Sequence, residues 1–248
     1  AYNVRSWMKG ISGLLFSQTL NYQEAIPGNT PCYNGNISRM SWKSGDETIE
    51  SGYRFTYDGL SRLKDAIYGE GSYLASNMNR FNEQITGYDT LGNILGLKRY
   101  GQISASNYGL IDDLTLTYNG NQLQSVQDDA TYPVYGNGME FKDGANQSVE
   151  YLYDKNGNLT KDLNKNIYVI EYNLLNLPSQ VIFVDGNVIE YEYGSDGRKL
   201  RTVHITNGVT STTDYCGNAI YENGSLKMLL NEAGYVSFPD KKFHFYLK

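Results

Sequence analysis

Tyr151-Leu-Tyr153-Asp154-Lys-Asn-Gly157-Asn-Leu159 is the stretch that decides the fold of this 248-residue chain. Its two tyrosines are alternate residues, which share one face of a sheet when they lie in a strand. Asp154 takes the first position of a four-residue turn, where its carboxylate can accept hydrogen bonds from nearby backbone amides. Gly157 follows where a left-handed backbone is needed, and Leu159 begins a second strand. The stretch therefore predicts a β-hairpin and its turn.

The same phrase, an aromatic strand end followed by Asp or Asn and then Gly, returns six times along the chain. The last three copies are spaced by about 20 residues, which indicates a unit of that length with loops or degenerate copies inserted between the earlier ones. Because the aromatic residues recur with the unit, we interpret them as structural rather than as a ligand site. The motif residues are Tyr57, Asp58, Tyr88, Asp89, Gly92, Tyr118, Asn119, Gly120, Tyr153, Asp154, Gly157, Tyr172, Asn173, Tyr193 and Gly197.

The copies differ in ways that the turn chemistry tolerates to different degrees. Asn176 stands where other copies have Gly, and Asn accepts a left-handed backbone better than other residues with a side chain. Ser61 is the poorest substitute at this position. The third copy is one residue shorter and predicts a tight Asn119-Gly120 turn. In the last copy, Leu200 arrives one residue late.

Tyr-Asp-x-x-Gly-Asn-Leu, as at 153–159, and Tyr-x-x-Asp-Gly-Arg-Lys-Leu, as at 193–200, carry a resemblance to a known family. They resemble the YD repeats of bacterial RHS proteins, which are related to teneurins and to toxin-complex shell proteins. The resemblance covers roughly residues 50 to 248 and is most specific at 151–201. Phe243-His-Phe-Tyr-Leu-Lys248 is similar to the entry of the RHS-associated core domain, whose Asp-His-Leu-Gly motif is absent here.

This resemblance implies an all-β fold in which stacked antiparallel hairpins form a curled sheet, a segment of a β-shell. It implies a non-catalytic part of a secreted or bacterial cell-surface protein. The shell would enclose or present a C-terminal effector, often a toxin, that belongs to the remainder of the same polypeptide. No catalytic residue of the family can be carried over. Since a piece of a shell leaves strand edges unpaired, we also expect a homodimer formed by edge pairing.

The repeats divide the chain into three regions of one continuous structural domain. We expect N-terminal strands that start the sheet at 1–50, the hairpin repeats at 51–200, and C-terminal strands at 201–248. Residues 69–81 look irregular or weakly helical. Residues 127–147 predict a protruding loop or a degenerate copy, with strand candidates at 131–135 and 139–141. Asn-Gly pairs at 207–208 and 223–224 predict two further tight turns.

Composition excludes several classes of function. Charged residues make up 19% of the chain, the net charge is −6, and no basic run is present. Nucleic-acid binding is therefore not expected. The sequence contains no apolar run of about 18 residues, so no membrane span is predicted. Cys32 and Cys216 do not make a disulfide framework, and we expect two separate buried or half-buried thiols, although a fold that brings them together would let them pair.

The search for catalytic and metal-binding residues predicts neither an enzyme nor a cofactor or metal site. The two histidines, His204 and His244, lie far apart in strand-like runs without partners at zinc-ligand spacing. No Gly-x-Ser-x-Gly elbow marks a nucleophile. Two alternatives stay open: a surface module that binds carbohydrate or a protein through exposed Tyr and Trp side chains, and a glycosidase built on two close carboxylates.

Overall fold

The computed structural model describes residues 1–131, 135–136 and 140–246. The fold is all-β, as predicted, and contains two antiparallel sheets of nine and eleven strands. The chain divides into two compact units, residues 1–143 and 144–248. This boundary lies inside the predicted repeat segment 51–200, and the three-region organisation of the chain stays a prediction. The strand candidates at 131–135 and 139–141 fall largely on residues outside the described part.

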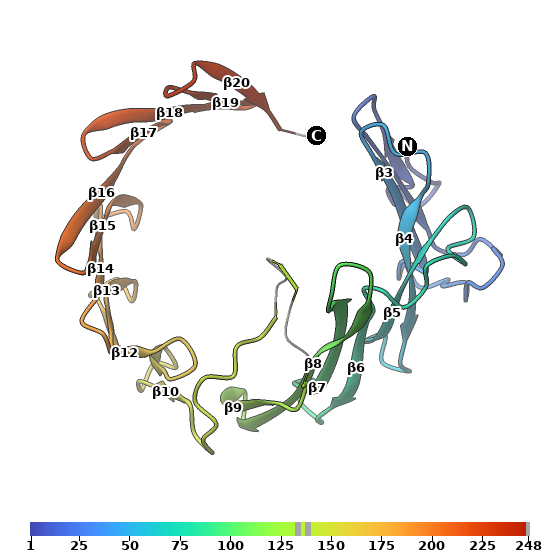
Figure 1. Ribbon diagram of the computed structural model, residues 1–248, viewed down its shortest axis with the longest axis horizontal. Helices are drawn as coiled ribbons and strands as arrows, with labels where there is room; N and C mark the ends of the chain where they lie inside the picture. The colour runs from blue at the N-terminus through green and yellow to red at the C-terminus, as the bar shows by residue number, and fades with distance from the viewer. Residues whose placement is uncertain (132–134, 137–139, 247–248) are drawn as a thin grey trace. The chain divides into compact units, whose positions relative to one another are not determined.

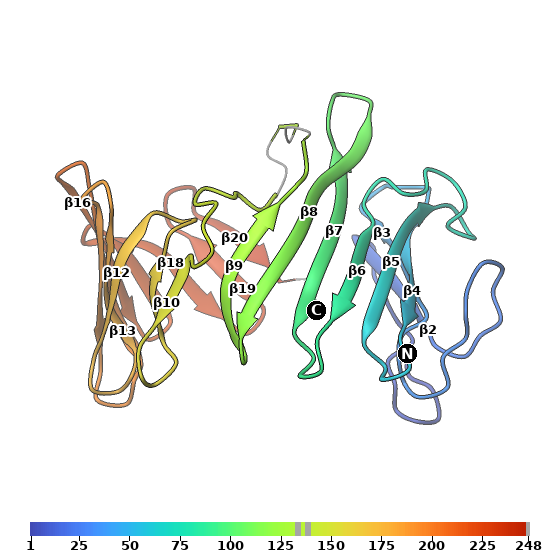
Figure 2. The same cartoon turned by 90° about the horizontal axis from the view of Figure 1, so that it is seen from below.

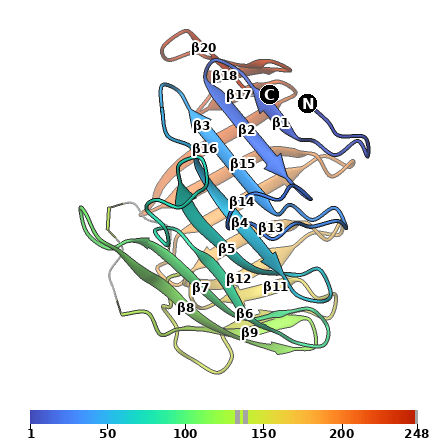
Figure 3. The same ribbon diagram turned by 90° about the vertical axis from the view of Figure 1, so that its right-hand side faces the viewer.

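The first unit holds strands β1 to β9, which lie side by side in chain order (Figure 3). Strands already form within residues 1–50. The bounds are β1 Gly10–Ser12, β2 Phe16–Asn21, β3 Arg39–Ser44, β4 Ser51–Tyr57, β5 Leu63–Glu70, β6 Glu83–Tyr88, β7 Ile94–Gln102, β8 Tyr108–Asn119 and β9 Gln122–Asp128.

The second unit holds β10 to β20, again in chain order, and its strands follow a curved path (Figure 1). Their bounds are β10 Tyr151–Tyr153, β11 Leu159–Asp162, β12 Ile167–Tyr172, β13 Pro178–Phe183, β14 Val188–Tyr193, β15 Lys199–Thr206, β16 Val209–Cys216, β17 Ala219–Glu222, β18 Ser225–Asn231, β19 Gly234–Ser237 and β20 Lys242–Phe245.

Each sheet is a meander in which every strand pairs with its neighbour in the sequence. Tight turns make this possible. At 207–208 and 223–224 the Asn and the Gly are both left-handed, with φ values of 51° and 78° and of 49° and 77°. Two left-handed central residues define the type I′ turn, which matches the twist of the strands that it joins. Both predicted Asn-Gly turns are therefore confirmed.

A β-bulge accompanies each of the six motif tyrosines. The pairing register shifts immediately before each tyrosine, so one residue of the partner strand is left over. In the last copy Tyr193 pairs with Lys199 and Glu192 with Arg201, so Leu200 is the extra residue. A bulge bends its strand and increases the local twist. One bulge beside the turn of each motif hairpin is a physical cause of curvature in each sheet.

The core of the first unit lies partly under β5, around Leu74. The segment 69–81 contains no helix: after β5 the chain turns back, Glu70 and Ser76 form an isolated bridge, and Leu74 is fully buried. Gly69 faces Gly52 across the strands, and a Cβ on either glycine would collide with backbone atoms. The irregular part of the prediction for 69–81 is correct, and the helical part is wrong, because burying Leu74 needs a close turn against two glycines.

Candidate functional site

The motif residues form one type of hydrogen-bonded turn. It recurs in each sheet at the same end of the strands (Figure 2). In four copies a side-chain oxygen of the first turn residue accepts two backbone N–H groups, two and four residues further along, at 2.8 to 3.0 Å. This is the carboxylate role predicted for Asp. The acceptors and donors are Asp58 with Leu60 and Arg62, Asp89 with Leu91 and Asn93, Asp154 with Asn156 and Asn158, and Asn173 with Leu175 and Leu177.

The fourth turn residue is left-handed in every four-residue copy. Its φ is 94° at Gly92, 84° at Gly157 and 80° at Gly197, and it is also positive at Asn176 (59°) and Ser61 (65°). In each case its N–H donates to the carbonyl of the first turn residue. Ser61 therefore adopts the same backbone as glycine although its side chain makes this conformation less favourable.

Two copies depart from the common turn. The third closes with Asn119 paired to Gln122, so the central residues are Gly120 and Asn121 rather than Asn119 and Gly120. Gly120 alone is left-handed there, as in a type II′ turn. In the last copy Gly194 offers no side-chain acceptor, and Asp196 instead accepts the N–H of Arg198 at 3.0 Å.

The residue after the left-handed position joins one turn to the next. Arg62, Asn93 and Asn158 donate to the second carboxylate oxygen of their own aspartate at 2.7 to 2.9 Å. Each also donates to the neighbouring copy. The acceptors are the carbonyl of Asp89 at 3.4 Å, the carbonyl of Gly120 at 3.1 Å and Oδ1 of Asn176 at 2.6 Å. These bonds connect the first three turns with one another and the 154–157 turn with the 173–176 turn; we call these connected turns the turn row.

These hydrogen bonds lower the pKa values of the turn carboxyl groups. The backbone N–H of Arg62 is the largest cause at Asp58, and the side chain of Asn158 is the largest at Asp154. At Asp89, desolvation acts in the opposite direction, but the side chain and N–H of Asn93 outweigh it and the pKa falls. A carboxylate that accepts several N–H bonds is stabilised in its charged form.

The motif tyrosines link neighbouring hairpins through their hydroxyl groups. Tyr88 donates to the carbonyl of Leu63 at 2.6 Å, and Tyr172 donates to the carbonyl of Leu159 at 2.8 Å. Leu63 and Leu159 hold equivalent places, at the start of the strand that follows the preceding turn. Burial raises the pKa of both tyrosines. The Arg62 guanidinium also lies 4.2 Å from the centre of the Tyr88 ring.

A second aromatic array crosses the first unit outside the motif. Neighbouring rings of Trp42, Tyr53, Tyr68, Phe81 and Tyr108 have centroids 5.0 to 5.8 Å apart. Tyr68 is only 7% exposed, and burial, together with Glu83 and Tyr68, raises the pKa of Tyr53 to about 12. Aromatic pairs at these distances stabilise beyond the area that they bury. This array is packed rather than arranged along an open groove.

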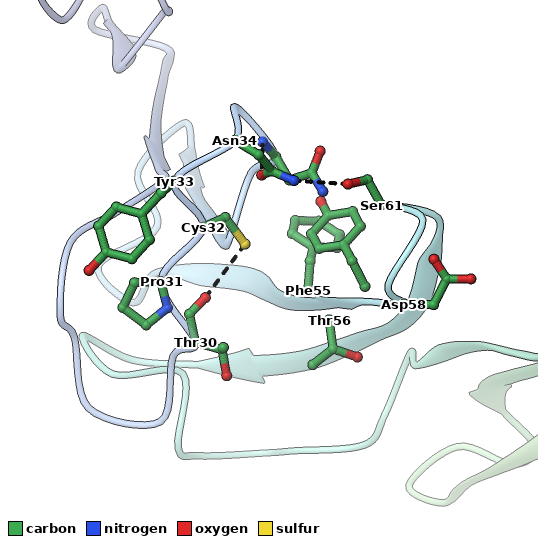
Figure 4. Close-up of a pocket in the computed structure, with 11 residues that line it drawn as sticks. Thr30, Pro31, Cys32, Tyr33, Asn34, Phe55, Thr56, Asp58 and Ser61 are labelled. Atoms are coloured by element: carbon green, nitrogen blue, oxygen red, sulfur yellow. Dashed lines mark hydrogen bonds between the residues drawn. The ribbon is translucent and has the colours of Figure 1, made fainter.

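A pocket of about 440 Å³ lies beside the first turn of the turn row, between the segment 30–36 and the end of β4 (Figure 4). Phe55 and Tyr57 supply aromatic surface, while Tyr33 and Cys32 line the side toward the loop. Trp7 packs behind this loop, with its ring 3.2 Å from the position that a Cβ on Gly35 would occupy.

The polar groups of this pocket are amides and hydroxyls. Asn34 Nδ2 donates to Ser61 Oγ at 2.9 Å, and Asn34 Oδ1 accepts the backbone N–H of Asn36 at 3.1 Å. Asp58 also lines the pocket, but its carboxylate is held by its own turn and by Arg62. Burial raises the pKa of the Cys32 thiol.

A second, more open pocket of about 490 Å³ brings Asp46, Glu47 and Glu70 to one place. The two glutamates already have partners. Glu47 accepts the N–H of Ser44 at 3.1 Å, and Glu70 accepts Tyr68 and Asn77 and pairs with Arg80. Among the described residues no group of three or more His, Cys, Asp or Glu side chains is placed to hold a metal ion. The described part also lacks any helix long and apolar enough to cross a membrane.

Of the other residues singled out in the sequence, Cys32 lines the first pocket, whereas Cys216, His204 and His244 belong to the second unit. Cys32 and Cys216 are both free thiols. Cys32 is half-buried, as expected, but the expectation is wrong for Cys216, which is exposed at the end of β16. His204 lies in β15 opposite Ser211. His244 lies in β20, where its ring stacks on Tyr235 with centroids 4.7 Å apart.

Sequence reasoning missed the linking residues and the bulges. Asn93 and Asn158 each follow the glycine of their copy, so the Gly-Asn pair is a signal that could have revealed the link between turns. Arg62 performs the same role with a different side chain and gave no such signal. The bulges depend on which residues of two strands face each other, and no single copy of the motif records that.

Comparison with known proteins returns no match among protein-family models and none among curated proteins. Solved structures do match. A TcdB2–TccC3–Cdc42 structure is 15% identical over 94% of this chain and 15% of that chain, with a TM-score of 0.37. A TcdB2–TccC3–TEV structure is 14% identical over 88% of this chain and 14% of that chain, with a TM-score of 0.34. The Photorhabdus luminescens Tc holotoxin pore is 14% identical over 93% of this chain and 17% of that chain, with a TM-score of 0.25. The chain thus spans about a seventh of the length of the first two solved chains.

Proposed function

We propose that the chain is a non-catalytic repeat segment of a secreted or cell-surface protein. In this role it scaffolds part of a shell that encloses or presents a C-terminal effector carried by the remainder of the same polypeptide. One observation carries the proposal: the turn and the bulge recur, and side-chain hydrogen bonds from the turn and from the motif tyrosine join neighbouring hairpins in both units.

A wall needs a unit that repeats its geometry and binds its neighbour. The links from Asn158 to Asn176 and from Tyr172 to Leu159 both connect consecutive hairpins. In a repeat array, stability is approximately the sum of each unit and its nearest-neighbour interfaces. Such links therefore support an extended sheet that can be lengthened by adding hairpins.

The hydrogen bonds made by the turn carboxylates support a non-catalytic role. The turn carboxylates accept backbone and side-chain N–H groups of their own turns, which leaves them poorly suited as general bases. If the chain were a glycosidase, the carboxylates of the open pocket would be the candidates for its catalytic pair. Turnover of chromogenic glycosides that is lost in Glu70→Gln would replace the scaffold proposal with that alternative.

The scaffold role is tested on the natural polypeptide in which this segment occurs. A shell predicts that the C-terminal effector resists added protease as long as the wall is folded and is digested after mild denaturation. An effector that is cleaved freely while the hairpins remain protected would contradict the proposal.

A binding module is a second candidate, favoured by the pocket beside the first turn. Edge pairing into a homodimer stays a prediction. Strand β20 is the last of its sheet and carries the exposed rings of Phe243 and Phe245. The mass of the protein in solution, measured by light scattering, tests the dimer.

A further inference from the structure

We infer that the pocket beside the first turn binds a neutral saccharide residue. This inference goes beyond the scaffold role and does not depend on it, since it rests on one pocket rather than on the repeats. The pocket volume of about 440 Å³ lies in the range of about 300–1,000 Å³ typical of small-ligand sites.

The aromatic surface of the pocket suits the C–H face of a sugar ring. Phe55 and Tyr57 are alternate residues of β4 and share one face of the sheet. Aromatic rings carry a negative face, to which the weakly positive C–H groups of a pyranose are attracted. Tyr33, which is 68% exposed, lies on the loop side of the pocket. Such an exposed ring can pack on a ligand that enters.

The polar groups of the pocket suit sugar hydroxyls, which both donate and accept. Ser61 Oγ accepts from Asn34, so its own hydroxyl hydrogen can turn to a ligand. Within the described part of the chain, Asn36 forms its hydrogen bond to Asn34 through the backbone N–H. Its side-chain amide can therefore offer donors and an acceptor to a ligand. A lining that combines amides and hydroxyls with aromatic rings makes a site for a ligand with a polar edge and an apolar face.

The charge balance of the pocket favours a neutral ligand. Asp58 is the only carboxylate among the described residues that line it, and Arg62 Nε lies 2.7 Å from Asp58 Oδ2. A charged ligand would find neither a free cation nor a free anion there. An acidic or basic peptide is the competing occupant.

The two cysteines allow a test on the unmodified protein, with an internal control. Cys32 lines the pocket, whereas Cys216 is exposed on β16 of the other unit. Alkylation of both thiols by iodoacetamide is followed by peptide mass spectrometry at about pH 8.5, because the thiolate is the reacting form. The probes are methyl glycosides of glucose, galactose and N-acetylglucosamine at about 10 mM. A dissociation constant of about 1 mM would slow alkylation of Cys32 about tenfold and leave Cys216 unchanged.

Two variants assign the effect to the pocket. Tyr33→Ala and Asn36→Ala should each abolish most of the protection of Cys32 by the sugar. Tyr168→Ala is the matched control, because Tyr168 is an exposed tyrosine of β12 and should leave the protection intact. The alkylation rate of Cys32 without sugar reports whether each variant keeps the fold of the loop.

The inference is overturned if none of these glycosides slows alkylation of Cys32. It is equally overturned if both cysteines are slowed alike, if Tyr168→Ala abolishes the effect, or if only charged sugars or peptides protect. The scaffold proposal is untouched by any of these results, since its own test measures protease resistance of the effector.

Discussion

At the scale of single residues, the fold depends on one acceptor and one left-handed position in each turn. Asp and Asn serve equally as the acceptor, because each presents a side-chain oxygen to the same two N–H groups, as Asp154 and Asn173 do. Gly, Asn and Ser all occupy the left-handed position. Each turn needs a side-chain oxygen that accepts and a residue with a left-handed backbone, but more than one residue type can fill each position.

The acceptor can therefore be tested by two substitutions at one site. Asp154→Asn keeps the oxygen that accepts the two backbone N–H groups but replaces the second oxygen, which accepts Asn158 Nδ2, so it should lower the melting temperature only slightly. Asp154→Ala removes the oxygen, leaves the N–H groups of Asn156 and Asn158 without it, and should lower the melting temperature by several degrees. Thermal unfolding followed by circular dichroism measures both. Equal destabilisation by the two variants would contradict the acceptor role.

The left-handed position makes a similar prediction. Gly157 has a φ of 84°, and the equivalent Asn176 shows that Asn tolerates this conformation. Gly157→Ala should cost about 1–2 kcal/mol in the free energy of unfolding, whereas Gly157→Asn should cost clearly less. Urea denaturation of the two variants gives the comparison. An alanine variant as stable as the wild-type protein would show that the turn has another backbone.

Acid should weaken the turn row. The pKa values of Asp58, Asp89 and Asp154 are lowered in the folded protein, so their contribution to stability is full above the unfolded pKa of about 4. It is lost as the pH falls through the lowered values. Asp154→Asn cannot titrate at this site, so its stability should fall less steeply below about pH 4. Identical pH profiles for the variant and the wild-type protein would exclude this linkage.

At the scale of elements, the hairpin is the unit, and its sequence predicts its turn better than its pairing. Positions such as Asn207-Gly208 encode the turn locally, because both residues favour a left-handed backbone. The bulge at Leu200 is not encoded locally, since Lys199 takes the place opposite Tyr193 only when the two strands meet. The aromatic array and the pocket escaped prediction for the same reason: their residues come from segments far apart in the sequence.

The hydroxyl links between hairpins can be removed without changing the size of the ring. Tyr88→Phe deletes the hydroxyl that donates to Leu63 and should cost about 1 kcal/mol in the free energy of unfolding. Tyr168→Phe is the control, because this tyrosine is 60% exposed. Equal losses in urea denaturation would show that the motif hydroxyl has no special role.

At the scale of the whole molecule, each unit is a sheet whose hairpins are joined by packing and by the turn row. In the first unit the aromatic array adds a second link between strands. The pKa of Tyr53 is raised to about 12, so the folded state retains its proton above pH 10. That contribution to stability is complete below the ordinary tyrosine pKa of about 10 and is lost as the pH rises through about 12.

An alkaline titration tests this packing in the intact chain. Absorbance at the tyrosinate band should show most tyrosines ionising near pH 10 and a late fraction near pH 12, accompanied by unfolding. Tyr53→Phe should reduce the late fraction. A single transition near pH 10 with the fold retained would mean that Tyr53 is accessible to solvent.

The most direct test of the central claim, that each hairpin is held by the next through the turn row, is native-state hydrogen exchange on Asn158→Ala. The account predicts that exchange accelerates in the variant's own turn at 154–157 and in the next turn at 173–176, because Asn158 bonds both. Turns at 207–208 and 223–224 should stay as protected as in the wild-type protein. Faster exchange confined to 154–157 would contradict the account, because the hairpins would then be independent units rather than a continuous wall.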